Sequence, residues 1–336
     1  MQQIHKKVFR AARLLTAAAA IATCAHAQGG ASAAAEGSFP SHAITIVVPF
    51  PPGGTADAIP RLLEPELSKS LGVPVVIESH PGASGIVGAA YVARSKPDGH
   101  VLLMVTPPIL AVNQWLYKDL PYSPEKDFAA ITNAVETPNM IVVAPSLPVH
   151  SLQELIALAK AKPGVLSFAS GGNGTSHHLC GEMLKKAAGI DMIHVPYKGV
   201  GPAKIDLLAG RVSMMCDNIS NVIESVRAGR LRALAIAAPE RSPLAPDVPT
   251  TAEAGEPGLD IGAWFGFVAP AGTPQQVVQR LNRELSRALH DKAVAARLAD
   301  LGLTVVADSP VHFAHFISSE ATRMGDLVRA AHAKAD

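Results

Sequence analysis

Aromatic residues are scarce in this chain, which has two Trp, four Tyr and nine Phe among 336 residues. Proteins that bind single-stranded nucleic acid stack bases on aromatic side chains, and proteins that bind duplexes need clustered Lys and Arg. Here 29 basic residues nearly balance 28 acidic ones, and no basic run follows the first 13 residues. The composition therefore argues against a nucleic-acid partner.

Cysteine is also rare, with three residues in all. So few cysteines exclude a fold that depends on a disulfide framework. Cys180 lies in an apolar helical context and Cys216 ends an expected strand. We interpret them as two small buried thiols, with a bridge between them as the alternative.

Long hydrophobic runs are absent from the chain after its N-terminal segment. In that part, no stretch reaches the roughly 18 apolar residues that a membrane-spanning helix needs. The 48% hydrophobic content is nevertheless too high for a disordered chain. At about 150 residues per domain, the length suggests two domains. These features predict a soluble chain with well-developed cores.

The first 27 residues have the three parts of a secretory signal peptide. A basic segment precedes the apolar stretch Leu14–Ala22, and Ala25-His26-Ala27 forms a small-residue site with cleavage after Ala27. Two alternatives stay open: a retained N-terminal helix, and a lipoprotein acylated at Cys24. Residues 28–38 are rich in Ala, Gly and Ser and are expected to be flexible.

Cleavage changes the charge of the chain. Residues 1–27 contain four basic and no acidic residues, so the remainder has 25 basic against 28 acidic residues and a formal charge of about −3. The exported chain is therefore expected to be mildly acidic.

Short apolar runs alternate with amphipathic stretches after residue 40, as in parallel α/β units. The expected strands are Ile44–Val48, Val73–Ile77, Val101–Val105, Met140–Ala144, Val165–Ala169, Met192–Val195, Val212–Cys216, Leu231–Ala237 and Trp264–Val268. Gln275–Leu289 and His312–Ala333 are expected to be long helices. A helix from Thr55 contains Pro60 and Pro65, which should kink it or shorten its first turns. Ser151 and Glu154 form a capping box.

Three glycine-rich loops follow expected strands and precede expected helices: Pro49–Asp57, Pro81–Gly85 and Gly171–Ser176. Glycine lets the backbone approach a ligand closely, and the N–H groups at a helix N-terminus attract anions. Ligands of open α/β sheets bind beyond the carboxyl ends of the strands. The loops therefore predict a shared anion cleft, against the alternative of tight turns in which Thr55 or Asp57 caps a helix. None of them has the Walker or G-x-G-x-x-G pattern.

Catalytic and metal signatures are weak. Ser84 lacks the spacing of a nucleophile elbow, and neither His177-His178 nor the pair His312 and His315 has a further ligand at metal-site spacing. No metal or cofactor is therefore expected. His178 could donate to a bound anion or belong to the core.

For some polar residues near the expected cleft, two roles are possible. Asp217 and Asn218 end a strand, from which they could face the cleft or form a plain turn. Lys198 and Arg211 could pair with a ligand carboxylate, or lie on the solvated surface.

In combination, several motifs resemble the Bug family of periplasmic solute receptors, the substrate-binding components of tripartite tricarboxylate transporters. The likeness covers about residues 39–335. The motifs are Phe50-Pro51-Pro52-Gly53-Gly54-Thr55-Ala56-Asp57, Leu120-Pro121-Tyr122-Ser123-Pro124-Glu125-Lys126-Asp127-Phe128, His194-Val195-Pro196-Tyr197-Lys198-Gly199, Leu231-Arg232-Ala233-Leu234-Ala235, Asp247-Val248-Pro249-Thr250, Trp264-Phe265-Gly266 and Ala269-Pro270-Ala271-Gly272-Thr273-Pro274.

The resemblance implies an α/β, two-lobed periplasmic binding protein of the type II, Venus-flytrap kind, in which each lobe is a sheet flanked by helices. Lobe 1 would be discontinuous, formed by residues 39–139 and 240–336, and lobe 2 would be residues 140–239. The protein would be a periplasmic monomer working with the membrane subunits of a tripartite tricarboxylate transporter. Carried over to this sequence, the residues lining the cleft would be Phe50, Gly53, Gly54, Asp57, Ser84, Thr106, Gly174, Thr175, His178, Tyr197 and Asp217.

The resulting hypothesis is a non-enzymatic receptor that closes on a small carboxylate: a di- or tricarboxylate, an acidic amino acid or an aromatic acid. Two alternatives remain. One is an exported enzyme acting on a carboxylate, with Ser84 or Asp217 and His178 as its catalytic groups. The other is a binding protein used for sensing instead of transport.

Overall fold

A computed structural model of the chain describes residues 39–331. The predicted signal peptide and the expected flexible segment 28–38 lie outside the described residues. Among those that are described, none of the helices combines the length and apolarity needed to cross a membrane.

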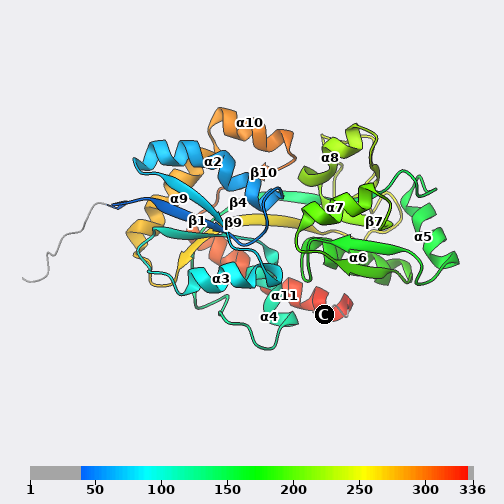
Figure 1. The fold of residues 1–336 in the computed structure, drawn as a ribbon, viewed down its shortest axis with the longest axis horizontal. Coiled ribbons are helices and arrows are strands. Elements are labelled where there is room, and N and C mark those ends of the chain that lie inside the picture. Colours follow the sequence, from blue (N-terminus) through cyan, green and yellow to red (C-terminus); the bar gives the residue numbers. More distant parts are fainter. Residues whose placement is uncertain (1–38, 332–336) are drawn as a thin grey trace, which may run out of the picture. The chain divides into compact units, whose positions relative to one another are not determined.

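The chain alternates strands and helices through most of its length (Figure 1). The strands are β1 (Ile44–Val48), β2 (Val75–Ser79), β3 (Val101–Val105), β4 (Phe128–Val143), β5 (Ser167–Ser170), β6 (Ile193–Pro196), β7 (Met214–Asn218), β8 (Arg232–Ala237), β9 (Gly262–Pro270) and β10 (Thr304–Val305). The helices are α2 (Thr55–Leu71), η1 (Ala83–Gly85), α3 (Ile86–Ala93), η2 (Pro108–Val112), α4 (Asn113–Leu116), α5 (Leu152–Ala161), α6 (Ser176–Ala188), α7 (Val200–Leu208), α8 (Ile219–Arg227), α9 (Gln275–Leu289), α10 (Lys292–Asp300) and α11 (Pro310–Ala331).

The strands follow the order β2-β1-β3-β9-β4-β7-β5-β6, with β8 and β10 also paired to β4. Within this order, β1 runs parallel to β2 and β3, and β5 runs parallel to β6 and β7. Strand β4 is antiparallel to all its partners: residues 128–138 pair with β9, and residues 139–143 pair with β7 and β8. We call β1, β2, β3, β9, β10 and the first part of β4 the β1–β3 half, and the remaining strands the β5–β7 half.

Helices cover both faces of each half. Figure 1 shows α2 and α9 on one face of the β1–β3 half and α3 and α11 on the other, and it shows α7 and α6 on opposite faces of the β5–β7 half. This arrangement confirms the predicted α/β class. The division into two lobes with boundaries near residues 139 and 240 stays a prediction, although β4 changes partners between Pro138 and Asn139.

Buried aliphatic side chains form the cores on which these helices pack. One cluster includes Val47, Leu103, Ile141 and Phe168, and a second includes Val142 and Met215. Ile141 and Val142 are neighbours on β4 and point to opposite faces because side chains alternate along a strand. Strand β4 therefore contributes to both clusters and is covered on both sides.

Helix α2 corrects the expectation that Pro60 and Pro65 shorten its first turns. It begins at Thr55 and runs for 17 residues with both prolines inside it. An interior proline costs about 3 kcal/mol, but Ile59, Leu63 and Leu67 are buried on the same helix, and each such side chain contributes about 1.5–3 kcal/mol. Burial of the apolar face therefore outweighs the missing hydrogen bonds.

Several further elements differ from the sequence prediction, among them β4, α8 and α10. Strand β4 begins at Phe128 instead of Met140, since its first part contains polar residues that hide the strand pattern. Helices α8 and α10 were not predicted. The capping box is confirmed at Ser151, whose Oγ accepts from Glu154 N, while the Glu154 carboxylate accepts from His150 N.

Cys180 and Cys216 form a disulfide, so the interpretation of two free thiols is wrong. Cys180 lies on α6 and Cys216 on β7, and both are fully buried. The sequence could not reveal the bridge because 36 residues separate the two cysteines and only the packing of α6 against β7 brings them together.

We expect the double substitution C180A/C216A to lower the free energy of unfolding by about 2–4 kcal/mol, because the bridge closes a 36-residue loop in the unfolded chain. Denaturant unfolding of the variant and of the wild type, each with and without a thiol reductant, measures this loss. Reductant should move the wild type toward the variant and leave the variant unchanged. Equal midpoints for wild type and variant under oxidising conditions would contradict the prediction.

We expect Gly181→Ala to destabilise the protein by about 1–3 kcal/mol. A Cβ at this position of α6 would collide with the Phe168 ring, although alanine is intrinsically the better helix former by about 1 kcal/mol. Gly201→Ala on α7 is the matched control, because a Cβ there meets nothing within 4 Å. Thermal unfolding should therefore separate the two variants, with the control no less stable than the wild type.

Candidate functional site

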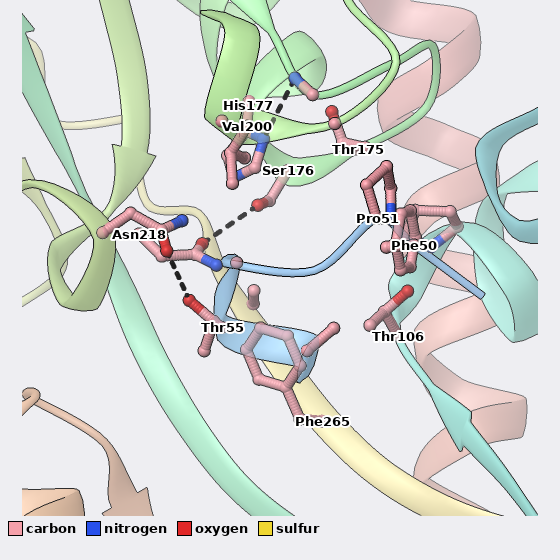
Figure 2. Close-up of a pocket in the computed structure, with 18 of the residues that line it drawn as sticks. Phe50, Pro51, Thr55, Thr106, Thr175, Ser176, His177, Val200, Asn218 and Phe265 are labelled. Atoms are coloured by element: carbon pink, nitrogen blue, oxygen red, sulfur yellow. Dashed lines mark hydrogen bonds between the residues drawn. The ribbon is translucent and has the colours of Figure 1, made fainter. Parts of the chain in front are cut away.

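A cavity lies where loops of the β1–β3 half meet loops of the β5–β7 half. Its empty volume is about 650 Å³, counting the part that opens to solvent. The lining residues come from the segments after β1, β3, β5, β6 and β7, together with part of β9. Figure 2 shows Ser176, His177 and Val200 on one side of this space and Phe50, Thr106 and Phe265 on the other. The candidate site is therefore built from segments far apart in the sequence.

The loop after β1 brings the start of α2 to the cavity. Gly53 has a φ of +94°, a conformation that favours glycine, and its N–H donates to Asp57 Oδ2 at 3.0 Å. Asp57 Oδ1 also accepts from Arg61 Nε at 2.9 Å. Gly54 precedes α2 without a side-chain cap. Asp57 therefore holds the loop in shape, and the cavity is lined by Gly54 and its neighbours.

The loop after β5 is folded by glycine and threonine in a similar way. Gly172 and Gly174 have φ angles of +134° and +75°, and Thr175 Oγ1 donates to Gly172 O at 2.7 Å. The same Oγ1 caps α6 by accepting from His178 N. The loop thus presents Thr175 and the first residues of α6 to the cavity.

The loop after β2 reaches the opposite half of the sheet without lining the cavity. Ala83 and Ser84 have φ angles of 44° and 52°, in the left-handed region that is unfavourable for residues other than glycine. Ser84 Oγ donates to Asn173 O at 2.7 Å, across to the loop after β5. Asn113 Nδ2 donates to Ser84 O at 3.3 Å. The strained loop therefore joins the two halves by a hydrogen bond at one edge of the cavity.

A second hydrogen-bonded contact joins the halves from α2. Thr55 Oγ1 lies 2.6 Å from Ser220 Oγ and donates to Asn221 Oδ1 at 3.0 Å. Asn221 Nδ2 in turn donates to Asp217 Oδ1 at 2.7 Å. Ser176 Oγ lies 3.5 Å from Asn218 Oδ1, beside this network. Polar side chains therefore gather where α2, α6 and α8 begin.

The rest of the wall is apolar, with Phe50, Phe265, Val200 and five prolines among the lining residues. No Lys, Arg, Asp or Glu side chain belongs to the lining within residues 39–331, and His177 is the one titratable group there. Thr106 Oγ1 is buried at the cavity and has no hydrogen-bond partner among the described residues. An anion in this space would therefore depend on backbone N–H groups, hydroxyls and one imidazole.

Four of the residues predicted for the cleft line the cavity: Phe50, Gly54, Thr106 and Thr175. The other seven lie outside its lining, and several of them support the loops that form it. They are Gly53, Asp57, Ser84, Gly174, His178, Tyr197 and Asp217.

The predicted residues outside the lining have partners of their own. His178 Nδ1 accepts from Gly174 N at 3.1 Å, and its ring stacks on His194. Burial, reinforced by the charge of Lys185, lowers the pKa of His194 to about 4, so this stacked neighbour is uncharged at neutral pH. Tyr197 Oη donates to Asp206 Oδ2 at 2.7 Å.

Lys198 and Arg211 are not part of the cavity. Arg211 Nη1 donates to Asp206 Oδ1 at 2.7 Å on an exposed part of the surface, and Lys198 is absent from the lining residues of the described chain. No group of three or more His, Cys, Asp or Glu residues within 39–331 is placed to hold a metal ion. Neither basic side chain therefore contacts a molecule in this space.

Several lining residues were not predicted, among them His177, Val200, Asn221 and Phe265. Val200 directly follows a quoted motif and Phe265 lies inside another, so a local signal was present. His177 was considered only as a metal ligand. Its position at the start of a helix, directly after a glycine-rich loop, indicated a place at the cavity. Asn221 has no local signal, because it faces the cavity only through the unpredicted helix α8.

Comparison with known proteins agrees with this architecture. A family model described as the tripartite tricarboxylate transporter family receptor matches residues 59–332. Protein BugT of Bordetella pertussis is 39% identical over 297 residues, which cover 88% of this chain and 91% of BugT.

Two solved structures from Rhodopseudomonas palustris are also similar. One is a protein with adipate, with a TM-score of 0.86, 34% identity and coverage of 89% of this chain and 100% of that one. The other is MatC with bound malate, with a TM-score of 0.83, 38% identity and coverage of 86% and 100%. The resemblance seen in the sequence is thereby confirmed: the chain belongs to the tripartite tricarboxylate transporter receptor family, which comprises solute-binding receptors and not enzymes.

Proposed function

We propose that this chain is an extracytoplasmic receptor that binds a small carboxylate in the cavity and delivers it to the membrane subunits of a tripartite tricarboxylate transporter. The similar proteins with adipate and malate support the ligand class. The N-terminal signal pattern supports export to the periplasm, with cleavage after Ala27. The protein would act as a monomer.

The observation that carries the proposal is the meeting of helix N-termini at a cavity without charged lining residues. Thr55, Ser176 and Val200 are the first residues of α2, α6 and α7, and all three line the cavity. Asn218, which precedes α8, lines it as well. The first N–H groups of a helix have no partner within the helix, and each helix N-terminus favours an anion by about 0.3–1 kcal/mol, or about 2 when partly buried.

The apolar wall complements these donors. Phe50 and Phe265 would contact the carbon chain or ring of a ligand whose carboxylate lies at the helix N-termini. The predicted lobes would then close around the ligand. The contacts of Ser84 and Thr55, which cross between the two halves, would hold the lobes together. The candidate residues Gly53, Asp57, Gly174, Tyr197 and the others outside the lining would act by shaping these loops.

Binding of carboxylates gives the first test. At a free concentration 100 times its dissociation constant, a ligand stabilises its receptor by about 2.7 kcal/mol, which raises the melting temperature by several degrees. We expect adipate, malate or another acid from a panel of small carboxylates to produce such a shift. The matched neutral amides should produce none, because they lack the charge that the helix N-termini favour.

The proposal would be overturned by a panel of carboxylates that leaves the melting temperature unchanged, together with native mass spectrometry that finds no acid bound to the purified protein. A shift of equal size with the neutral amides would instead overturn the role of the helix N-termini. Isothermal titration calorimetry on each ligand that produces a shift provides the dissociation constant.

Ser84→Ala tests closure of the two halves. Its Oγ donates to Asn173 O across the cavity edge, and a neutral hydrogen bond contributes about 0.5–1.5 kcal/mol. We therefore expect ligand affinity to fall about twofold to tenfold, mainly through faster dissociation in stopped-flow measurements. Ser95→Ala is the control, because Ser95 Oγ donates to Tyr91 O within its own segment. Equal dissociation rates in the Ser84 variant and the wild type would contradict this role.

A further inference from the structure

His177 differs from every other lining residue of the cavity because it is titratable and all the others carry no ionisable side chain within the described part of the chain. It is the second residue of α6 and is 6% exposed. Figure 2 shows its ring beside Val200 and Ser176, on the side of the cavity formed by the β5–β7 half.

The contacts of the ring assign the tautomer of its neutral form. His177 Nδ1 accepts from Gly171 N at 3.4 Å, a long hydrogen bond. A nitrogen that accepts carries no proton, so the ring proton of the neutral form lies on Nε2. His177 Nε2 is 3.1 Å from Asp217 Oδ1, but no described residue accepts from it in good hydrogen-bond geometry.

Asp217 is well placed to stabilise a positive charge on this ring. Its side chain is fully buried, and Oδ1 accepts from Asn218 N at 2.8 Å and from Asn221 Nδ2 at 2.7 Å. Its other oxygen, Oδ2, has no partner among the described residues. A carboxylate oxygen 3.1 Å from the ring nitrogen attracts a positive charge placed on the imidazole.

Several other charged and titratable groups on the surrounding elements have partners elsewhere. On α2, Asp57 accepts from Gly53 N and Arg61. On α7, Lys204 Nζ donates to Asn221 O, and Asp206 binds Tyr197 and Arg211. On α6, His178 stacks on His194 of β6. Asp217 is thus the charged group in contact with His177.

We propose that His177 takes up a proton from solvent when a carboxylate enters the cavity, and that the imidazolium then binds the anion directly. This inference rests on the proposed function. The proton adds to Nδ1, so that Nδ1 becomes a donor to a ligand carboxylate oxygen. Gly171 N–H, which donates to Nδ1 of the neutral ring, then donates to the same ligand. Asp217, whose Oδ1 lies 3.1 Å from Nε2, is the positioning residue that stabilises the charged ring.

A linked dependence on pH follows from this assignment. A ligand carboxylate stabilises the charged form of the ring over the neutral form, so binding of the anion and uptake of a proton are coupled. Binding is therefore tightest at the acidic end of the range in which the ligand carboxylates are ionised. As the pH rises from there, affinity falls, at most about tenfold per pH unit.

Calorimetric titrations with malate and adipate between about pH 6 and about pH 8.5, in buffers of different ionisation enthalpy, test the proposal. Both acids are fully ionised through most of this range, since their carboxyl groups have pKa values near those of ordinary carboxyls. We expect the dissociation constant of wild-type protein to rise at least fivefold and the titration to show uptake of up to one proton. Affinity that is independent of pH without proton uptake would overturn the inference while leaving the proposed function intact.

Variants separate a direct role of His177 from a structural one. His177→Gln should bind more weakly at about pH 6, bind as well as the wild type at about pH 8.5, and take up no proton. Asp217→Asn should retain binding with a pH dependence displaced to lower pH, because the counter-charge of the ring is lost. His315→Gln, at an exposed position of α11, is the control and should titrate like the wild type.

The outcomes remain distinct if a variant fails to fold. Absence of proton uptake by the wild-type protein overturns the inference without any substitution. A His177→Gln variant that folds and keeps the pH profile of the wild type would overturn the inference. Failure of the wild type to bind any carboxylate at any pH would instead overturn the proposed function.

Discussion

The cavity depends on one strand that the two halves of the sheet share. The first part of β4 pairs with β9, and its last five residues pair with β7 and β8. The change of partner occurs at Pro138, which cannot donate a backbone hydrogen bond. Within the sheet, the strands of the two halves are connected through β4, with β9 next to it in the strand order. Any relative movement of the halves must therefore bend the chain near this point.

The electrostatics of the site are local. The chain after residue 27 has a formal charge of about −3, which repels anions weakly at long range, and physiological salt screens such charge beyond about 8 Å. Helix N-termini act over the first turn of each helix, inside a space partly closed to water. The proposed attraction for a carboxylate can thus arise from dipoles that the fold fixes in place. It does not require a positive net charge on the chain.

Much of the fold could be predicted from local patterns. The amphipathic helix Gln275–Leu289 and the strand Val101–Val105 have the expected bounds, because a strong apolar period or a short aliphatic run specifies each of them. The start of β4 could not be predicted, since its polar residues are paired and covered by distant segments. The Cys180–Cys216 bridge depends on the packing of α6 against β7, which no local pattern reports.

The site was harder to predict than the fold. Glycine loops identified the segments near the cavity, but whether a side chain faces the space or supports the loop depends on the orientation of each helix start. Asp57 and Thr55 show the difference: they are two residues apart, and Asp57 folds the loop while Thr55 lines the cavity.

The absence of charged side chains from the described cavity lining has a consequence for how such receptors diverge. Every residue except proline carries a backbone N–H, so most substitutions at the start of α2, α6 or α7 leave the donors for an anion in place. Side chains such as Val200 and Phe265 can therefore change in size and shape while the backbone donors for the proposed carboxylate stay in place. In the proposed receptor, the groups that would hold the charge shared by its ligands and the groups that would distinguish one ligand from another thus belong to different parts of the chain.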